Sequence, residues 1–272
     1  MSGEPAAQET PAALRRTAEQ AAKVAGQVLA ERFQGQRTIE FKHSGIDLVT
    51  DADKAAEQAL LGFLRERHPG HSVLAEESGA SEGTRLRWLV DPLDGTTNYA
   101  HRVPYFSVSV AVDGPGGVLA GAVYDPIRDE LFSAARGQGA TLNGQPLKAS
   151  GTSRLDRALL CTGFPYDVHE RPDGPLGMLN HFIRRAQGIR RTGSAALDLA
   201  YVAAGRFDGF FEFRLKPWDI GAGSLLVTEA GGVMSQLDGS PFDVMHGDVL
   251  ASAPGLAEVL LQECRLVLMA LA

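Results

Sequence analysis

Hydrophobic positions repeat at helical spacing in two segments near the start of the chain. From Thr10, which can cap a helix that has proline at its next position, apolar residues recur every three or four positions until Gly35. The same pattern starts again near Thr50 and ends before Gly70. We therefore expect two long amphipathic helices, with Asp53 in the first turn of the second.

Farther along, the pattern changes to short apolar or alternating runs separated by turn signals. These runs predict a largely antiparallel sheet, with strands over 86–90, 106–112, 118–124 and 130–134. After about residue 155, short strands occur together with helices, which is typical of an α/β layer. Strands are expected at 158–161, 207–212, 232–236 and 249–252, and helices near 175–187, 195–204, 219–230 and 254–270.

These patterns predict a mixed α and β fold in two parts. Residues 1–10 are expected to form a flexible tail, residues 11–150 an N-terminal α+β half and residues 151–272 a C-terminal α/β half. No internal repeat or Pro/Ser-rich linker separates the halves, so we expect them to pack as one unit.

The composition of the 272-residue chain is that of an ordinary globular protein, with 44% hydrophobic and 22% charged residues. Its net charge, 26 − 33 = −7, argues against a surface dedicated to nucleic acid or anionic membrane. The N-terminus lacks the pattern of a secretory signal, and the longest charge-free stretches, 114–124 and 137–147, are too short to cross a bilayer, so we expect a cytoplasmic protein. Cys161 and Cys264 form no CxxC motif and are interpreted as core thiols.

The segment WLVDPLDGTTN carries two aspartates, Asp91 and Asp94, directly after an apolar strand. The proline between them fixes the backbone, and Gly95 allows another group to approach the main chain closely. Carboxylates are suited to a hard divalent cation, and the free N–H groups of Thr96 and Thr97 would face a phosphate if a helical turn began there. The segment predicts a site for a cation and an anion together, with an ordinary turn as the alternative.

Two further acidic sites support this prediction. Glu76 and Glu77 follow a short apolar strand, and Asp219 precedes a predicted helix. Taken alone, the first pair is explained by a solvated loop and Asp219 by a helix cap. Together with Asp91 and Asp94, in this order and spacing, they indicate one acidic site.

Four motifs in the chain resemble the signatures of the inositol monophosphatase family, which are magnesium-dependent, lithium-sensitive sugar phosphatases. The motifs are Leu74-Ala-Glu-Glu-Ser78, Asp91-Pro-Leu-Asp-Gly-Thr-Thr-Asn98, Arg191-Thr-Gly-Ser-Ala-Ala196 and Trp218-Asp-Ile-Gly-Ala-Gly223. The resemblance runs from about Ala12 to the C-terminus, and residues 190–209 are most similar to the bacterial extragenic-suppressor type. It implies a layered αβαβα sandwich, a small phosphate ester as substrate and a homodimer.

The resemblance also implies a set of metal ligands. Glu76, Asp91 and the carbonyl of Leu93 would hold a first Mg²⁺. Asp91, Asp94 and Asp219 would hold a second, and Glu76 would help to hold a third through water. Because two Mg²⁺ balance four carboxylates, we expect the third ion to arrive with a phosphate dianion.

The remaining matches concern catalysis and the substrate. Asp53 and Thr96 match the pair that orients the attacking water, and Glu76 supports the same step through its metal ions. The matches to substrate-binding positions are Lys42 near the metal cluster, Gly95 and Thr96 at the phosphate, and Asp94, Ala195 and Glu212 at the inositol hydroxyls. The implied reaction is in-line hydrolysis of inositol monophosphate, without a covalent enzyme intermediate.

Other functions remain open at this stage. Fructose 1,6-bisphosphate, a nucleotide 3′-phosphate or histidinol phosphate are alternative substrates. A different class is an interaction protein of the transcription and RNA machinery, binding RNA polymerase or RNA, for which the basic residues Arg184, Arg185, Arg190 and Arg191 offer a surface. The seven histidines lack metal-ligand spacing, and no nucleotide-binding glycine loop or serine-nucleophile motif is present.

Overall fold

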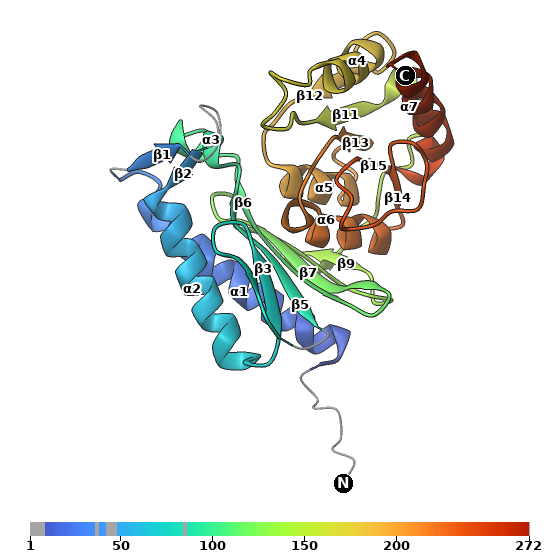
Figure 1. The fold of residues 1–272 in the computed structure, drawn as a ribbon. Helices are drawn as coiled ribbons and strands as arrows, with labels where there is room; N and C mark the ends of the chain where they lie inside the picture. The colour runs from blue at the N-terminus through green and yellow to red at the C-terminus, as the bar shows by residue number, and fades with distance from the viewer. Residues whose placement is uncertain (1–8, 36–37, 42–47, 84–85, 272) are drawn as a thin grey trace.

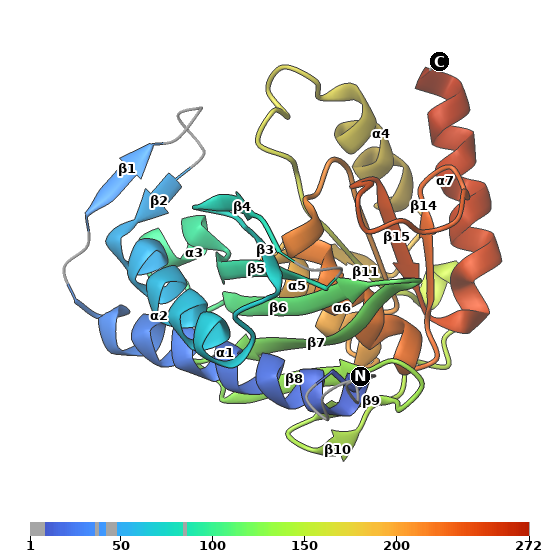
Figure 2. The same ribbon diagram turned by 60° about the horizontal axis from the view of Figure 1, so that its bottom comes forward.

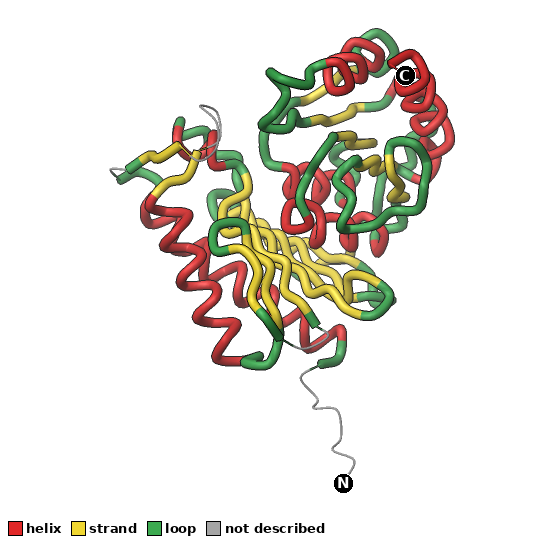
Figure 3. Tube along the Cα trace, in the orientation of Figure 1, coloured by secondary structure: helices red, strands yellow, loops and turns green. Residues whose placement is uncertain are grey.

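The computed structural model of the chain describes residues 9–35, 38–41, 48–83 and 86–271. Its elements stack in five layers, in which pairs of helices alternate with an eight-stranded and a five-stranded sheet (Figure 1). Figure 3 shows the strands of the two larger sheets as separate groups with helices between them. The αβαβα sandwich implied by the resemblance is therefore confirmed.

The first layer consists of α1 (Pro11–Arg32) and α2 (Asp51–Arg67), which begin where the sequence predicts. Thr10 caps α1, and Thr50 caps α2 in a reciprocal arrangement with the side chain of Asp53. The buried faces of both helices pack on the large sheet, and α1 crosses β6 (Ser107–Gly114), β7 (Gly117–Asp125) and β8 (Glu130–Ala135) (Figure 2). The two helices thereby fix Asp53 close to that sheet.

The large sheet has the strand order β10-β9-β8-β7-β6-β5-β3-β4. It is antiparallel as predicted except where β3 pairs with β5 in parallel. A separate hairpin is formed by β1 (Ile39–Phe41) and β2 (Leu48–Thr50). The strands of the large sheet are β3 (Ser72–Ala75), β4 (Gly79–Ser81), β5 (Arg87–Asp94), β6 (Ser107–Gly114), β7 (Gly117–Asp125), β8 (Glu130–Ala135), β9 (Ala140–Leu142) and β10 (Gln145–Pro146).

The prediction that the strand before Asp91 ends at Val90 was wrong, because β5 continues to Asp94. Its register with β6 shifts between Asp91, which faces Ser109, and Asp94, which faces Ser107. A bulge of this kind accommodates a proline within a strand and redirects the neighbouring side chains. Both aspartates therefore lie on a strand instead of in a turn beyond it.

The second half forms a mixed sheet of order β12-β11-β13-β15-β14, in which the first three strands are parallel and the others antiparallel. Helices α5 and α6 lie between the two sheets, and α4 and α7 cover the outer face (Figure 1). The predicted helix over 175–187 ends at residue 182 and is followed by β12, which was not predicted. The elements of this half are β11 (Leu159–Thr162), α4 (Asp173–Phe182), β12 (Gly188–Arg190), α5 (Ala195–Ala203), β13 (Gly209–Glu212), α6 (Pro217–Glu229), β14 (Val233–Gln236), β15 (Val249–Ser252) and α7 (Ala257–Leu271), with short 3₁₀ turns at Leu155–Arg157 and Pro254–Leu256. The short helix α3 (Thr96–Ala100) belongs to the first half and follows β5.

The central core joins the two sheets. One cluster of buried side chains includes Leu89 and Val123 of the large sheet, Ile220 of α6, and Phe210 and Ala251 of the smaller sheet. The two cysteines are buried and unbridged, as predicted. Within the described ranges, no helix is both long and apolar enough to span a membrane.

Candidate active site

The acidic site begins where β3 and β5 run side by side. Their parallel register pairs Ala75 with Val90, and the N–H of Glu76 donates to the carbonyl of Val90 across 3.1 Å. This places Glu76 beside Asp91, whose Oδ1 accepts a hydrogen bond of 2.9 Å from the N–H of Leu93. Burial, the negative charge and side-chain contact of Glu76, and the charges of Asp94 and Asp219 raise the pKa of Asp91 well above its usual range.

Asp94 connects this strand to a segment about a hundred residues away. Its Oδ2 accepts hydrogen bonds from Ser194 Oγ at 2.6 Å and from the N–H of Ala196 at 2.8 Å. Its Oδ1 accepts from the N–H of Ala195 at 3.2 Å. Burial raises the pKa of Asp94, whereas these donors at the start of α5 lower it.

Asp219 lies in the first turn of α6, and its Oδ2 accepts a hydrogen bond of 2.7 Å from the N–H of Lys216. Burial raises the pKa of Asp219 well above its usual range, and the charges of Asp94 and Glu76 add to this effect. The preceding carbonyl, of Trp218, accepts a hydrogen bond of 2.8 Å from Ser109 Oγ on β6. Asp219 is therefore close enough to the β5 carboxylates to interact with them electrostatically.

The chemistry of these side chains fits Mg²⁺, because buried and half-buried carboxylates supply hard oxygen ligands whose mutual repulsion a divalent cation relieves. In the part of the chain that the structure describes, no three acidic, histidine or cysteine side chains are already arranged to hold a metal ion. The four carboxylates thus share one electrostatic environment without forming a finished coordination shell.

Two further site residues, Asp53 and Thr96, lie next to these four carboxylates. Thr96 Oγ1 is 3.1 Å from Asp53 Oδ1 and 3.1 Å from the carbonyl of Leu93, and it can donate to either oxygen. Asp53 Oδ2 accepts from the N–H of Thr50 at 2.9 Å and from its hydroxyl at 2.5 Å. Burial is the main cause that raises the pKa of Asp53 to about 6. The structure thus brings together the two residues that the resemblance pairs.

The turn after Asp94 exposes main-chain donors. Gly95 caps α3 with a φ of 102°, in the left-handed region that favours glycine, and provides no side-chain acceptor for the N–H groups of the first turn. Thr96 is buried beside Asp53, whereas the side chain of Thr97 is exposed. This turn can receive an anion through its backbone.

Glu212 ends β13 on the other side of the site and is buried. A Cβ on Gly163 would lie 2.0 Å from Glu212 Oε2, so a larger residue there would displace this carboxylate from its present position. Burial raises the pKa of Glu212 well above its usual range, the charge of Arg191 opposes this rise, and those of Asp219 and Asp94 add to it. Lys42, the remaining predicted site residue, lies outside the described residues.

Several residues that hold the site together were not predicted. Ser194, Ser107 and Ser109 contact Asp94 or the backbone beside Asp219. Glu57 Oε2 accepts a hydrogen bond of 3.0 Å from the N–H of Glu77 and so anchors the loop that carries Glu76. Its spacing of four residues from Asp53 on α2 is the one sequence signal that pointed to it.

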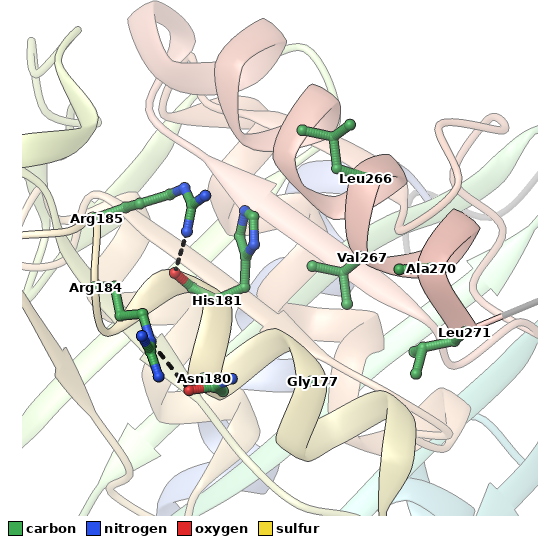
Figure 4. A pocket seen from close by; sticks show the side chains of 9 residues that line it. All are labelled: Gly177, Asn180, His181, Arg184, Arg185, Leu266, Val267, Ala270 and Leu271. Carbon is green, nitrogen blue, oxygen red and sulfur yellow. Dashed lines mark hydrogen bonds between the residues drawn. The ribbon is translucent and has the colours of Figure 1, made fainter.

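The basic residues singled out in the sequence lie at more than one place. Arg184 and Arg185 line a groove of about 480 Å³ between α4 and α7, in the outer helix layer (Figure 4). Arg185 pairs there with Glu263 at 3.3 Å. The guanidinium of Arg191 instead lies 5.5 Å from the ring centre of Phe164. The groove of Figure 4 contains none of the acidic site residues.

Comparisons with known proteins place the chain in a family. The profile of the inositol monophosphatase family matches residues 11–268, and the chain belongs to this family of phosphatases. It is 45% identical over 248 residues to the Nus factor SuhB of Salmonella typhimurium, covering 90% of this chain and 93% of that protein. The Escherichia coli Nus factor SuhB is 44% identical over the same shares of both chains.

Solved structures agree with this assignment. The inositol monophosphatase from Anabaena superposes with a TM-score of 0.83 at 42% identity, covering 92% of this chain and 94% of that one. The extragenic suppressor protein suhB from Bartonella henselae gives a TM-score of 0.88 at 38% identity, covering 93% and 98%. The resemblance drawn from the sequence motifs is therefore confirmed.

Proposed function

We propose that the chain hydrolyses a small phosphate monoester, with inositol monophosphate as the first candidate, in a Mg²⁺-dependent reaction. The observation that carries this proposal is the shared environment of three carboxylates. Asp91 and Asp94 are buried, Asp219 is half-buried, and the charges of Asp94 and Asp219 raise the pKa of Asp91. Such crowding is unfavourable for a purely structural site and favourable for one that binds cations.

We assign the metal ligands as the family resemblance suggests. Glu76, Asp91 and the carbonyl of Leu93 would hold one Mg²⁺, and Asp91, Asp94 and Asp219 another. When bound, these ions supply neutralisation of the phosphate charge and activation of a water molecule. The bonds from α5 to Asp94 hold that carboxylate in place beforehand.

Asp53 and Thr96 act on the attacking water. Since the pKa of Asp53 is about 6, its carboxylate is largely ionised at neutral pH and can accept the hydrogen of Thr96 Oγ1. The lone pairs of Thr96 are then directed to a hydrogen of water, which orients the water for in-line attack. The phosphate would be received by the uncapped N–H groups of Gly95, Thr96 and Thr97.

Substrate hydroxyls would bind between the two halves of the chain. Glu212 is buried at the end of β13, where its carboxylate would accept a hydrogen bond from an alcohol of the substrate. The charge of Asp94 reaches this region, since it raises the pKa of Glu212, whereas Ala195 and Lys42 are assigned to it from the resemblance alone. A polyol phosphate meets these requirements better than a phosphate ester without neighbouring hydroxyl groups.

A phosphate-release screen tests this proposal. Inositol monophosphate, fructose 1,6-bisphosphate, a nucleotide 3′-phosphate and histidinol phosphate are compared with Mg²⁺ present, then chelated, then challenged with Li⁺. We expect turnover of inositol monophosphate that chelation abolishes and Li⁺ inhibits. Equal turnover in EDTA would contradict the metal-dependent mechanism, and a preference for another ester would replace the substrate.

A second candidate function comes from the relatives named Nus factor, which are 44–45% identical to this chain. In that role the chain would bind the transcription machinery, RNA polymerase or RNA included, and hydrolysis would not be required. Retention of RNA polymerase on the immobilised protein is compared for the parent chain and Asp91→Asn. Capture that survives this substitution would favour the binding role, and absence of capture would argue against it.

We further propose, from the family resemblance, a cytoplasmic homodimer. Within each chain, residues 11–150 and 151–272 would unfold as one unit, because the bonds between Asp94 and α5 and the shared core join them. Light scattering tests the dimer. Calorimetry tests the single unit, and two separate thermal transitions would contradict it.

A further inference from the structure

A buried carboxylate behind the acidic site has no role in the proposed chemistry. Asp198, in the first turn of α5, is 1% exposed. Its oxygens accept hydrogen bonds from Thr192 Oγ1 at 2.5 and 2.6 Å and from the hydroxyl of Tyr105 at 2.7 Å. Asp198 therefore joins the segment before α5 to the segment after α3.

A second side chain holds the same two segments. The amide of Asn98 donates to the carbonyl of Tyr105 at 2.7 Å and to the carbonyl of Thr192 at 2.8 Å. Thr192 is thus held by its carbonyl and by its hydroxyl, from two different elements. The backbone then turns at Gly193, with a φ of 92°, and continues directly into Ser194.

The turn at residues 192–194 leads to the donors that bind Asp94. We call the hydrogen bonds of Asp198 and Asn98 that hold this turn the clamp. Ser194 Oγ and the N–H groups of Ala195 and Ala196 lie two to four residues after Thr192, and all three bond to the Asp94 carboxylate. A shift of the turn would change every one of these bonds together. Among the described residues, Asp198 forms no hydrogen bond with Asp94, so its effect on the position of Asp94 passes through Thr192.

The cost of burying this carboxylate indicates that the clamp matters. Burial raises the pKa of Asp198 to about 7, the hydroxyls of Thr192 and Tyr105 and the thiol of Cys161 lower it, and the charge of Asp94 adds to the rise. A buried carboxylate without a cation is unfavourable unless hydrogen bonds hold it, and in return each bond to a charged group is stronger than one between neutral groups. In its ionised form, Asp198 therefore fixes the turn more firmly than a neutral acceptor would.

We propose that Asp198 is a positioning residue, which through Thr192 and Tyr105 sets the geometry of residues 192–196 and hence that of Asp94. The inference rests on the proposed function in one respect, namely that Asp94 binds metal and substrate. The positioning of the turn itself does not depend on that function.

The test compares three substitutions that weaken the clamp with two that do not. Asp198→Asn, Thr192→Val and Tyr105→Phe each change one partner of the network. Thr192→Ser keeps the hydroxyl and serves as the conservative rescue. Tyr124→Phe is the matched control, because it removes the same kind of tyrosine–aspartate bond, 2.9 Å to Asp129, in an exposed turn.

The first readout is amide hydrogen exchange at Ala195 and Ala196, which needs no activity. We expect exchange to speed up about tenfold in the weakened variants relative to the parent, with Thr192→Ser and Tyr124→Phe close to the parent. Exchange at amides of β6 and β7 in the same samples corrects for global destabilisation. Unchanged exchange at Ala195 and Ala196 after this correction would overturn the inference.

The second readout is calorimetric titration with Mg²⁺ alone. If Asp94 is a ligand, loosening of the turn should weaken Mg²⁺ binding about 10- to 100-fold, as is usual for residues behind a metal ligand. Faster exchange with unchanged Mg²⁺ affinity would overturn the effect on Asp94 while leaving the phosphatase proposal intact. Absence of Mg²⁺ binding by the parent chain would instead contradict the proposed function, and the exchange result would stand by itself.

Discussion

Thr96 Oγ1 lies 3.1 Å from Asp53 Oδ1, which links the first turn of α3 to the first turn of α2. The start of each helix is fixed by its own local sequence, Gly95 in one case and Thr50 in the other. The pair thus depends on two local signals and one tertiary contact.

Loss of the Thr96 hydroxyl should mainly affect the chemical step. We expect Thr96→Val to lower kcat about 10²- to 10⁴-fold with little change in KM, because the attacking water loses its orienting partner. Thr96→Ser keeps the hydroxyl and should stay within about tenfold of the parent. Steady-state phosphate release measures both, and equal activity of the valine and serine variants would contradict the assigned role.

The close approach of Gly163 to Glu212 gives a prediction for substrate binding. In Gly163→Ala the new methyl would collide with the Glu212 carboxylate, which we expect to raise KM about tenfold or more and to cost about 1–3 kcal/mol in the free energy of unfolding. Gly151→Ala is the matched control, since nothing lies within 4 Å of the added Cβ. Equal KM values for the two variants would show that Glu212 does not contact the substrate.

The raised pKa values predict how pH and Mg²⁺ act on stability. Asp53, with a pKa of about 6, and Asp91 and Asp219, with pKa values well above the usual range, bind protons more tightly in the folded than in the unfolded chain. Their destabilising effect is therefore complete above the folded pKa values, and it decreases as the pH falls toward the unfolded value near 3.8. Bound Mg²⁺ would reduce this destabilising effect at high pH, because it neutralises the ionised carboxylates.

Thermal unfolding at pH 8 and pH 5.5, in EDTA and in Mg²⁺, measures this effect. We expect Mg²⁺ to raise Tm more at pH 8 than at pH 5.5, because protons compete for the carboxylates at the lower pH. In Asp219→Asn, the Tm increase caused by Mg²⁺ should differ less between pH 8 and pH 5.5 than in the parent chain. A Tm increase of the same size at both pH values would argue against carboxylate ligands.

The parts of the fold that follow from short-range signals could be predicted. Both N-terminal helices begin at capping residues that precede an apolar helical pattern, Thr10 and Thr50, and these starts were confirmed. The predicted end of β5 was wrong. A proline usually marks the end of a strand, whereas here the bulge before Asp94 accommodates Pro92. That bulge depends on pairing with β6, which local sequence does not encode.

The candidate site shows the same limit. Asp91 and Asp94 were found because an acidic motif follows a strand, and Ala195 was named only through the family resemblance. Ser194 and Glu57 were missed, since their roles arise from contacts with Asp94 and Glu77 across the fold. A serine that precedes a helix has no local pattern that distinguishes such a contact from an ordinary cap, and the four-residue spacing of Glu57 from Asp53 indicates only that both lie on one face of α2.

Asp91 is central to the account because it is assigned to both metal ions and because Glu76, Asp94 and Asp219 all act on its pKa. The most direct test is the rate of phosphate release from inositol monophosphate at saturating Mg²⁺, measured for the parent chain and for Asp91→Asn. We predict a loss of at least about 10³-fold in kcat/KM on substitution, the size expected when several kcal/mol of transition-state stabilisation are removed. A variant that retains activity within about tenfold of the parent would contradict the claim that these carboxylates hold the catalytic metal ions.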